Sequence, residues 1–182
     1  MRTSDTHPLY INWIPVEGDE GKIGITLCPG KYQPVSSTGA WNRDLVTDIA
    51  ALHTAGTQRL VSLVTEDDMQ MLRVPTLPEE VAARGIEWDH LPIPDTTVPT
   101  EAWMEAAAPV VQHLLTAIPD GEVVVVHCMG GLSRAGLFVS LYLWMRGMAM
   151  PEAIEHVRAM RSPHCINFRQ QRFLIRLAEN GE

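Results

Sequence analysis

The chain has 182 residues, of which 46% are hydrophobic and 20% charged. This composition is typical of one soluble globular domain, here expected over 1–182, and excludes disordered, collagen-like and disulfide-scaffold classes. The 14 Lys and Arg residues against 22 Asp and Glu give a net charge of −8. Nucleic acids and anionic membranes attract basic surfaces, so neither is an expected partner, and a phosphate could be bound only by a small local positive site.

The first third of the chain is rich in Gly and Pro and carries short β-prone pieces at 10–14 and 22–27. A turn is expected at Cys28-Pro29-Gly30. Asn42 is expected to cap a helix over 43–55, whose apolar side chains fall on one face.

The next segment is predicted to contain a strand over 59–64 and another over 86–91, separated by a short helix. The pattern Thr76-x-x-Glu79 is a capping box, which marks the start of that helix. A proline-rich loop, 92–99, follows the second strand.

The second half is predicted to be mainly helical around one buried strand. Thr100 caps a long helix through 118, and the four valines of 123–126 lack alternation, as in a strand buried on both faces. Further helices are expected at 134–146, from Pro151 onward, and over 167–179. Strands that alternate with helices predict an α/β domain with a central, mostly parallel sheet flanked by helices.

The chemically informative segment is His127-Cys128-Met129-Gly130-Gly131-Leu132-Ser133-Arg134. It joins the buried strand to an apolar helix, and ligand sites in α/β sheets lie at such strand ends. The two glycines let the loop curl, so that the backbone N–H groups from Met129 to Arg134 can surround an anion at the helix N-terminus. Phosphate binding is therefore expected at Met129, Gly130, Gly131, Leu132, Ser133 and Arg134.

Cys128 and Arg134 are the candidate catalytic residues of this loop. The guanidinium of Arg134 can hold two phosphate oxygens, and an electropositive loop favours the thiolate of Cys128. A thiolate beneath a bound phosphate is a nucleophile in line with the leaving oxygen. A lone cysteine at a strand end is usually structural, but the order strand, cysteine, glycine pair, arginine, helix favours catalysis.

With the pattern H-C-x-x-G-x-x-R, this loop resembles the phosphate loop of the cysteine-dependent protein tyrosine and dual-specificity phosphatases. The segment Pro92-Ile93-Pro94-Asp95 is similar to the loop that carries the general acid in that family. Leu27-Cys28-Pro29-Gly30 and Pro151-Glu152-Ala153-Ile154 are similar to the kinase-associated, cyclin-dependent kinase inhibitor 3-like branch. The resemblance implies a tyrosine phosphatase-like fold.

The resemblance also implies a hydrolase mechanism through a phosphocysteine. Cys128 attacks phosphorus while Asp95 protonates the leaving oxygen, and Asp95 then acts as base on the hydrolytic water. No metal and no cofactor are expected. The implied substrate is a phosphorylated protein, with phosphotyrosine first and phosphoserine or phosphothreonine left open. The loop carries no lysine, which argues against a polyphosphorylated lipid.

Two features depart from the family pattern. Ala135 stands where a Ser or Thr hydroxyl usually stabilises the departing thiolate, so a slow second step is expected. Asn167 and Gln171 match a pair of water-positioning glutamines, although a helix cap and a solvated side chain explain them equally well. His127 is expected to be buried and hydrogen-bonded to the loop backbone rather than to act as a base.

Two alternatives to a phosphatase remain open. The first is a phosphopeptide-binding pseudophosphatase, which Ala135 supports; the second is a cysteine-based arsenate reductase or sulfurtransferase, which would need a resolving thiol. The other cysteines, Cys28 and Cys165, show neither disulfide-framework nor zinc spacing, which favours a reducing, cytoplasmic location. A monomer is expected, and the N-terminus has no secretory signal pattern.

Overall fold

The computed structural model describes residues 1–181, and its centre is a five-stranded mixed sheet. The strands are β1 (Asn12–Ile14), β2 (Lys22–Thr26), β5 (Arg59–Ser62), β6 (Glu87–His90) and β7 (Val123–His127), in the order β1-β2-β7-β5-β6. Only β1 runs antiparallel to its neighbour. A separate hairpin pairs β3 (Tyr32–Gln33) with β4 (Trp41–Asn42). The mostly parallel sheet predicted from the sequence is confirmed.

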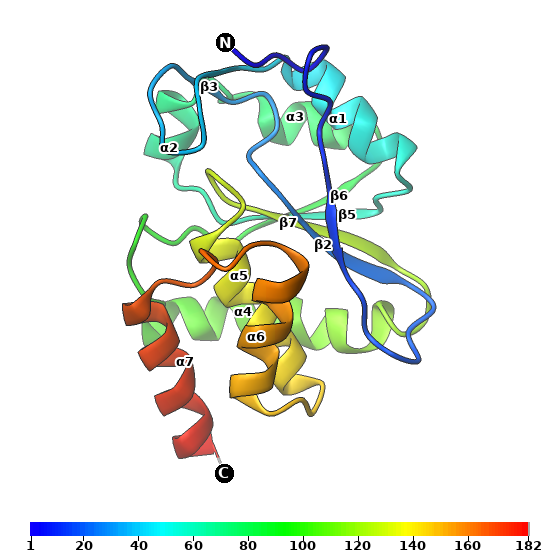
Figure 1. Ribbon diagram of the computed structural model, residues 1–182. Coiled ribbons are helices and arrows are strands. Elements are labelled where there is room, and N and C mark those ends of the chain that lie inside the picture. Colours follow the sequence, from blue (N-terminus) through cyan, green and yellow to red (C-terminus); the bar gives the residue numbers. More distant parts are fainter. Residues whose placement is uncertain (182) are drawn as a thin grey trace.

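Helices cover both faces of this sheet (Figure 1). One core packs beneath α1 (Leu45–Thr54), α2 (Glu66–Met71) and α3 (Leu77–Ala82). The other packs beneath α4 (Glu101–Ala117), α5 (Ser133–Met145), α6 (Met150–Met160) and α7 (Phe168–Gly181). Within residues 1–181, no helix is long and apolar enough to cross a bilayer.

The valine run of β7 lies at the centre of the sheet, between β2 and β5. Val124 and Val126 pack into the core beneath α4 to α7, whereas Val125 packs into the opposite core. Burial on both faces explains why this strand shows no polar alternation, as predicted. The strand therefore delivers the candidate loop from the middle of the sheet.

Two predicted helix caps were wrong. Asn42 lies in β4, where its amide donates to the carbonyl of Arg2, and the side chain that caps α1 is that of Asp44. Thr76 precedes α3 but makes no side-chain capping bond. Thr100 does cap α4, with its Oγ1 accepting from the amide of Trp103 at 3.2 Å.

The sequence reading missed α2. Its capping box consists of Thr65 and Asp68, each side chain accepting from the backbone N–H of the other at 3.1 Å. The pattern Thr-x-x-Asp was a usable signal for a helix start. This short helix matters because it carries Asp68 to the candidate site.

Candidate active site

The candidate phosphate loop spans the gap between the end of β7 and the start of α5. Gly131 adopts φ +62°, and a Cβ there would lie 2.4 Å from the carbonyl oxygen of Thr26 on β2. A glycine is therefore required where the loop passes over the neighbouring strand. A Cβ on Gly130 would meet only Leu132, at 3.8 Å, so the close approach is specific to Gly131.

The loop presents a series of free backbone donors. Within residues 1–181, none of the amides from Met129 to Arg134 donates to another backbone group or to a side chain. Leu132 precedes α5 and provides no side-chain cap, so the positive end of the helix dipole adds to these donors. Unpaired amides at a helix N-terminus are the features that the predicted anion-binding loop requires.

Arg134 is fully buried at the first turn of α5. Its Nη1 donates to the carboxylate of Asp68 at 2.6 Å and to the carbonyl of Ile93 at 2.9 Å. Its buried Nε and Nη2 make no hydrogen bond within residues 1–181. Nη2 lies 3.2 Å from Oδ1 of Asp95, in an ion pair without hydrogen-bond geometry. Two donors of the fork thus remain available for an oxyanion.

Burial alone would lower the pKa of Arg134, but the charges of Cys128, Asp68 and Asp95 raise it above its usual value. The guanidinium is therefore permanently charged inside the protein. Asp68 fixes the guanidinium through Nη1 and was not identified from the sequence, because 66 positions separate the two residues.

Cys128 and Asp95 meet in one cavity of about 240 Å³. Its lining also includes Met129, Gly130, Leu132 and Ser133 of the loop. Cys128 is 2% exposed, at the base of the loop, whereas the Asp95 side chain is 47% exposed. The cavity brings the predicted nucleophile and the predicted acid together.

A larger cavity of about 500 Å³ lies along α7, between Val98 and Asn180. It contains no cysteine, aspartate or histidine, so size alone would point to the wrong place. The chemistry-bearing residues lie in the smaller cavity.

The loop that carries Asp95 is tied to the start of α7. Thr96 has φ +62°, an unusual conformation for a residue with a side chain. Nδ2 of Asn167 lies 3.5 Å from the carbonyl of Thr96, and the buried Gln170 donates to the carbonyl of Thr97 at 3.0 Å. Gln171 instead accepts a hydrogen bond from Arg158 at 3.0 Å. Of the predicted pair, only Asn167 contacts the acid loop, and the sequence reading missed Gln170.

His127 is fully buried beneath the loop. Trp88 donates to the hydroxyl of Ser62 at 2.7 Å, and that hydroxyl lies 2.5 Å from Nε2 of His127. With Ser62 donating to Nε2, Nδ1 keeps its hydrogen and faces the carbonyl of Cys128 at 3.4 Å. Burial lowers the pKa of His127 to about 4, so the ring is neutral at physiological pH. The geometry agrees with the structural role expected for it.

Arg161, after the last turn of α6, holds the outer side of the loop. Its Nε donates to the carbonyl of Gly131 at 2.9 Å and its Nη2 to that of Gly130 at 3.2 Å. These bonds engage the carbonyls of Gly130 and Gly131, so Arg161 fixes the backbone of the two loop glycines. The sequence alone does not reveal this contact, because it depends on the packing of α6.

The other two cysteines lie outside the cavity lining and are fully buried. Burial raises the pKa of the Cys28 thiol and that of Cys165, the latter to about 11. Both are therefore protonated and poor nucleophiles near neutral pH. This argues against a redox mechanism that needs a ready resolving thiol.

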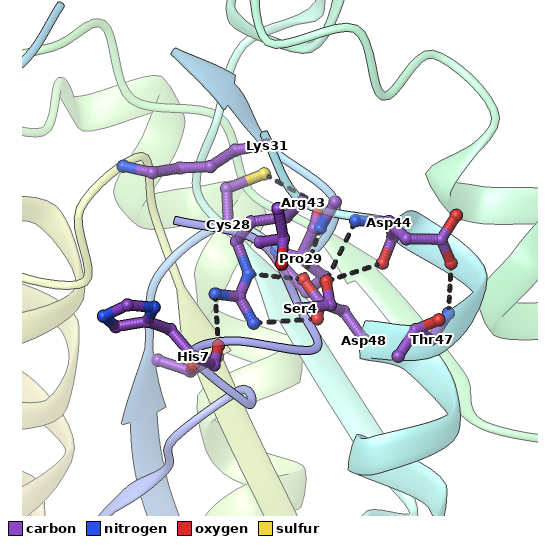
Figure 2. A network of polar contacts seen from close by, with 12 residues as sticks. Ser4, His7, Cys28, Pro29, Lys31, Arg43, Asp44, Thr47 and Asp48 are labelled. Atoms are coloured by element: carbon purple, nitrogen blue, oxygen red, sulfur yellow. Dashed lines mark hydrogen bonds and ion pairs between the residues drawn. The ribbon is translucent and has the colours of Figure 1, made fainter. Parts of the chain in front are cut away.

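Lys31, just before the β3–β4 hairpin, supplies a second cation to the cavity. Its ammonium donates to the carbonyl of Met129 at 3.3 Å and to Gln33 at 3.0 Å. Figure 2 shows it directed away from the buried ion pair between Arg43 and Asp48. This pair holds the backbone at Lys31, because Asp48 accepts from the amide of Gly30 and the amide of Arg43 donates to the carbonyl of Lys31. The sequence showed no lysine in the loop itself; the fold brings one to it from another segment.

We expect Lys31 to make oxyanion binding dependent on pH. Burial lowers the pKa of Lys31 to about 8, partly offset by Cys28 and Cys128, while Arg43 lowers it further. The ammonium is charged below that pH and neutral above it, so inhibition by tungstate, a dianion throughout this range, should weaken as the pH rises through about 8. In Lys31→Met, inhibition at neutral pH should be weaker by about fivefold.

The shape of the pH profile tests this role. Asp95, His164 and Cys128 also face the cavity. The informative quantity is therefore the change in tungstate inhibition near pH 8 that is present in the wild type and absent in Lys31→Met. Lys31→Arg should keep tight inhibition without that step, because a guanidinium stays charged. Lys22→Met is the matched control, since Lys22 is exposed on β2 and lies over the ring of Trp13. An unchanged step in Lys31→Met would exclude Lys31 as its source.

A cysteine delivered by a strand into a loop of free amides, beside a buried arginine, is the arrangement expected of a cysteine-dependent phosphatase. Residues 35–174 match the family model described as "Swiss Army Knife protein, DSP-PTPase phosphatase domain". The chain belongs to this family, and it is accordingly a protein phosphatase of the tyrosine and dual-specificity class.

The same class appears among similar proteins and structures. The chain is 28% identical over 163 residues to cyclin-dependent kinase inhibitor 3 of Mus musculus and 27% identical over 164 residues to that of Homo sapiens. Each match covers 87% of this chain and 73% of the relative. Among solved structures, a kinase associated phosphatase with serine replacing its catalytic-site cysteine superposes with a TM-score of 0.84 at 22% identity, covering 95% of this chain and 96% of that one. Tk-PTP in its active form gives 0.67 at 23% identity, covering 91% and 99%.

Proposed function

We propose that this chain hydrolyses phosphotyrosine in proteins through a phosphocysteine on Cys128. Sγ of Cys128 attacks phosphorus, the bond from phosphorus to the leaving oxygen breaks, and Asp95 gives that oxygen a proton. Water then attacks phosphorus, the bond to sulfur breaks, and the Asp95 carboxylate takes the proton. Arg134 and the loop amides stabilise the charge on the transferring group.

The observation that carries this proposal is the buried guanidinium of Arg134. The donors of a buried cation are normally hydrogen-bonded. Nε and Nη2 of Arg134 have no hydrogen-bond partner within residues 1–181, although Nη2 lies beside Asp95. A phosphoryl group that accepts from Nε and Nη2 would compete with Asp95 for Nη2. Asp95 would then be released from the ion pair and free to serve the leaving oxygen.

The leaving group tests the role of Asp95. We expect Asp95→Asn to lower turnover of phenyl phosphate and phosphotyrosine by about 10²- to 10⁴-fold, because their leaving groups need a proton. Para-nitrophenolate leaves readily without one, so turnover of its phosphate should fall much less. Asp67→Asn is a matched control, because Asp67 lies on α2 outside the cavity lining. Equal losses on both substrates would show that Asp95 is not the acid.

Ala135 favours a variant of this function in which turnover is slow because the phosphocysteine on Cys128 persists. Ala135 is fully buried and offers no hydroxyl to the departing thiolate. Ser133, which lines the cavity, is the nearest hydroxyl along the chain. We expect pre-steady-state kinetics on an aryl phosphate to show a burst of product and then a slow phase. A trace that is linear from the start would show that the second step is not slower than the first.

The biological setting is part of the same proposal. A phosphorylated protein is the substrate, and phosphotyrosine is preferred because it alone offers a long, flat group that can reach the base of the loop. The whole chain, 1–182, acts as one domain and as a monomer. Three free cysteines, two of them with raised pKa values, suit the reducing cytoplasm.

A further inference from the structure

The loop that carries Asp95 has little structure of its own. The segment 92–99 belongs to no helix or strand, and one turn in it is closed by the amide of Thr97, which donates to the carbonyl of Pro94 at 3.2 Å. Asp95 and Thr96 are exposed, and Thr96 holds a φ of +62°. A residue with a side chain keeps such a conformation only where its surroundings impose it. Contacts from outside the loop must therefore hold this segment.

The start of α7 supplies such contacts through a capping box. The amide of Gln170 donates to Oδ1 of Asn167 at 2.9 Å, and the amide of Asn167 donates to Oε1 of Gln170 at 3.1 Å. Because only the oxygen of the Gln170 side chain can accept, its orientation is fixed and Nε2 is left as a donor. Nε2 donates to the carbonyl of Thr97 at 3.0 Å, and Gln170 is fully buried. This bond joins α7 to the acid loop.

The turn before α7 is fixed against the helix of the phosphate loop. Arg158 on α6 donates from Nη2 to the carbonyl of Ile166 at 3.1 Å, and Ile166 is buried with φ +63°. A Cβ on Gly136 would lie 3.0 Å from Cγ1 of Ile166, so the turn packs closely on the first turn of α5, which also carries Arg134. Through this turn, Gln170 fixes the acid loop relative to the phosphate loop.

We propose that Gln170 is a positioning residue for the general acid, and that its bond to Thr97 keeps Asp95 within reach of the leaving oxygen. The ion pair of Asp95 with Nη2 of Arg134 competes with the phosphoryl group for that donor, so it cannot hold Asp95 during the reaction. The bond from Gln170 uses neither Arg134 nor the loop amides and can persist through both steps. This inference rests on the proposed function for the role of Asp95.

The dependence on the leaving group tests this role in Gln170→Met. We expect kcat for phenyl phosphate to fall by about tenfold, because its leaving group needs a well-placed proton donor. For para-nitrophenyl phosphate, kcat should fall by less than about twofold, since para-nitrophenolate leaves readily without a proton. KM and inhibition by tungstate should stay near their wild-type values, because Cys128, Arg134 and the loop amides are unchanged.

Two further variants separate positioning from a general loosening of α7. Gln170→Glu keeps an oxygen to accept from the amide of Asn167 but loses the donor to Thr97, so near neutral pH it should show the same selective loss as Gln170→Met. Leu174→Ala removes a fully buried side chain from the core beneath α7. It should lower stability and leave the ratio of the two rates unchanged, measured where both variants are folded.

A double-mutant cycle ties the effect to Asp95. In an Asp95→Asn background, Gln170→Met should cost nothing further on phenyl phosphate, because no acid remains to be positioned. Equal losses on both substrates, or an equal loss in both backgrounds, would overturn the inference. A wild-type chain without turnover would overturn the proposed function alone, and hydrogen exchange at the Thr97 amide then decides. Exchange that is faster in Gln170→Met than in Leu174→Ala supports the inference, and equal exchange overturns it.

Discussion

Cys128→Ser is expected to lower phosphatase turnover by on the order of 10⁴-fold or more, because removing a nucleophile removes the covalent pathway itself. Cys128 is 2% exposed and lies at the base of the phosphate loop, and it is the one thiol in the lining of this cavity within residues 1–181. Steady-state hydrolysis of para-nitrophenyl phosphate measures the loss. The variant should still bind phosphopeptides, since the amides and Arg134 are intact.

Cys165→Ser provides the matched control for this substitution. Cys165 is also a buried free thiol, and it lies outside the lining of the cavity. The Cys165→Ser variant should keep turnover close to that of the wild type. If Cys128→Ser retained more than about a hundredth of the wild-type rate, covalent catalysis by this thiol would be refuted.

Asp48→Asn is expected to destabilise the fold by about 3–5 kcal/mol, the usual cost of leaving one member of a buried ion pair uncompensated. The Arg43 and Asp48 side chains are each 1% exposed and are joined by two short bonds, of 2.7 and 2.9 Å. Oδ2 of Asp48 also accepts from the amide of Gly30 at 2.8 Å. Denaturant unfolding should show the loss, and Tm should fall by about 10 °C.

The comparison for Asp48 is Asp44→Asn on the same helix. Asp44 caps α1 with an exposed side chain. Its substitution by Asn should lower the free energy of unfolding by about 1 kcal/mol or less. A double-mutant cycle with Arg43→Met isolates the pair energy, because any change in the Gly30 bond is common to both arms that change Asp48. A loss below about 1 kcal/mol for Asp48→Asn would show that the ion pair does not hold the β3–β4 segment in place.

The ion pair also matters for function. Arg43 donates from Nη1 to the carbonyl of His7 at 2.8 Å, so one cluster fixes the N-terminal segment, the hairpin and α1 (Figure 2). The position of Lys31 depends on these segments. A loss of Lys31 placement in Asp48→Asn would appear as weaker tungstate inhibition in the fraction that remains folded.

The candidate residues of the phosphate loop could be predicted from local sequence. Cys128, Arg134 and the loop glycines lie within one short motif, so their roles could be predicted from chain order alone. Asp95 required the resemblance, because an aspartate among prolines has many structural uses. The cavity that holds both Cys128 and Asp95 is consistent with both predictions.

The residues that were missed all reach the site through tertiary packing. Asp68 arrives on α2, Lys31 from the segment before β3, and Arg161 from the end of α6. Separations of 30 to 98 positions leave no periodic or spacing signal in a single sequence. Only the capping box at Thr65 could have located α2, and it would not have revealed the partner of Asp68.

The errors in the fold have a similar origin. Capping patterns are local, but the side chain that caps a helix depends on where the preceding segment lies. Asn42 was drawn into a hairpin by pairing with Tyr32, which left Asp44 to cap α1. The prediction for β7 succeeded because four valines in a row suit few environments other than a central strand.

Rapid chemical quench with mass spectrometry tests the central claim most directly. The wild-type chain is mixed with an aryl phosphate, stopped in acid during the first turnover and digested, and the site of any added phosphoryl group is mapped. The account predicts a phosphoryl group on Cys128, more abundant than in a chain with Ser or Thr in place of Ala135. Product release in the first turnover with the phosphoryl group on another residue, or on none, would contradict it.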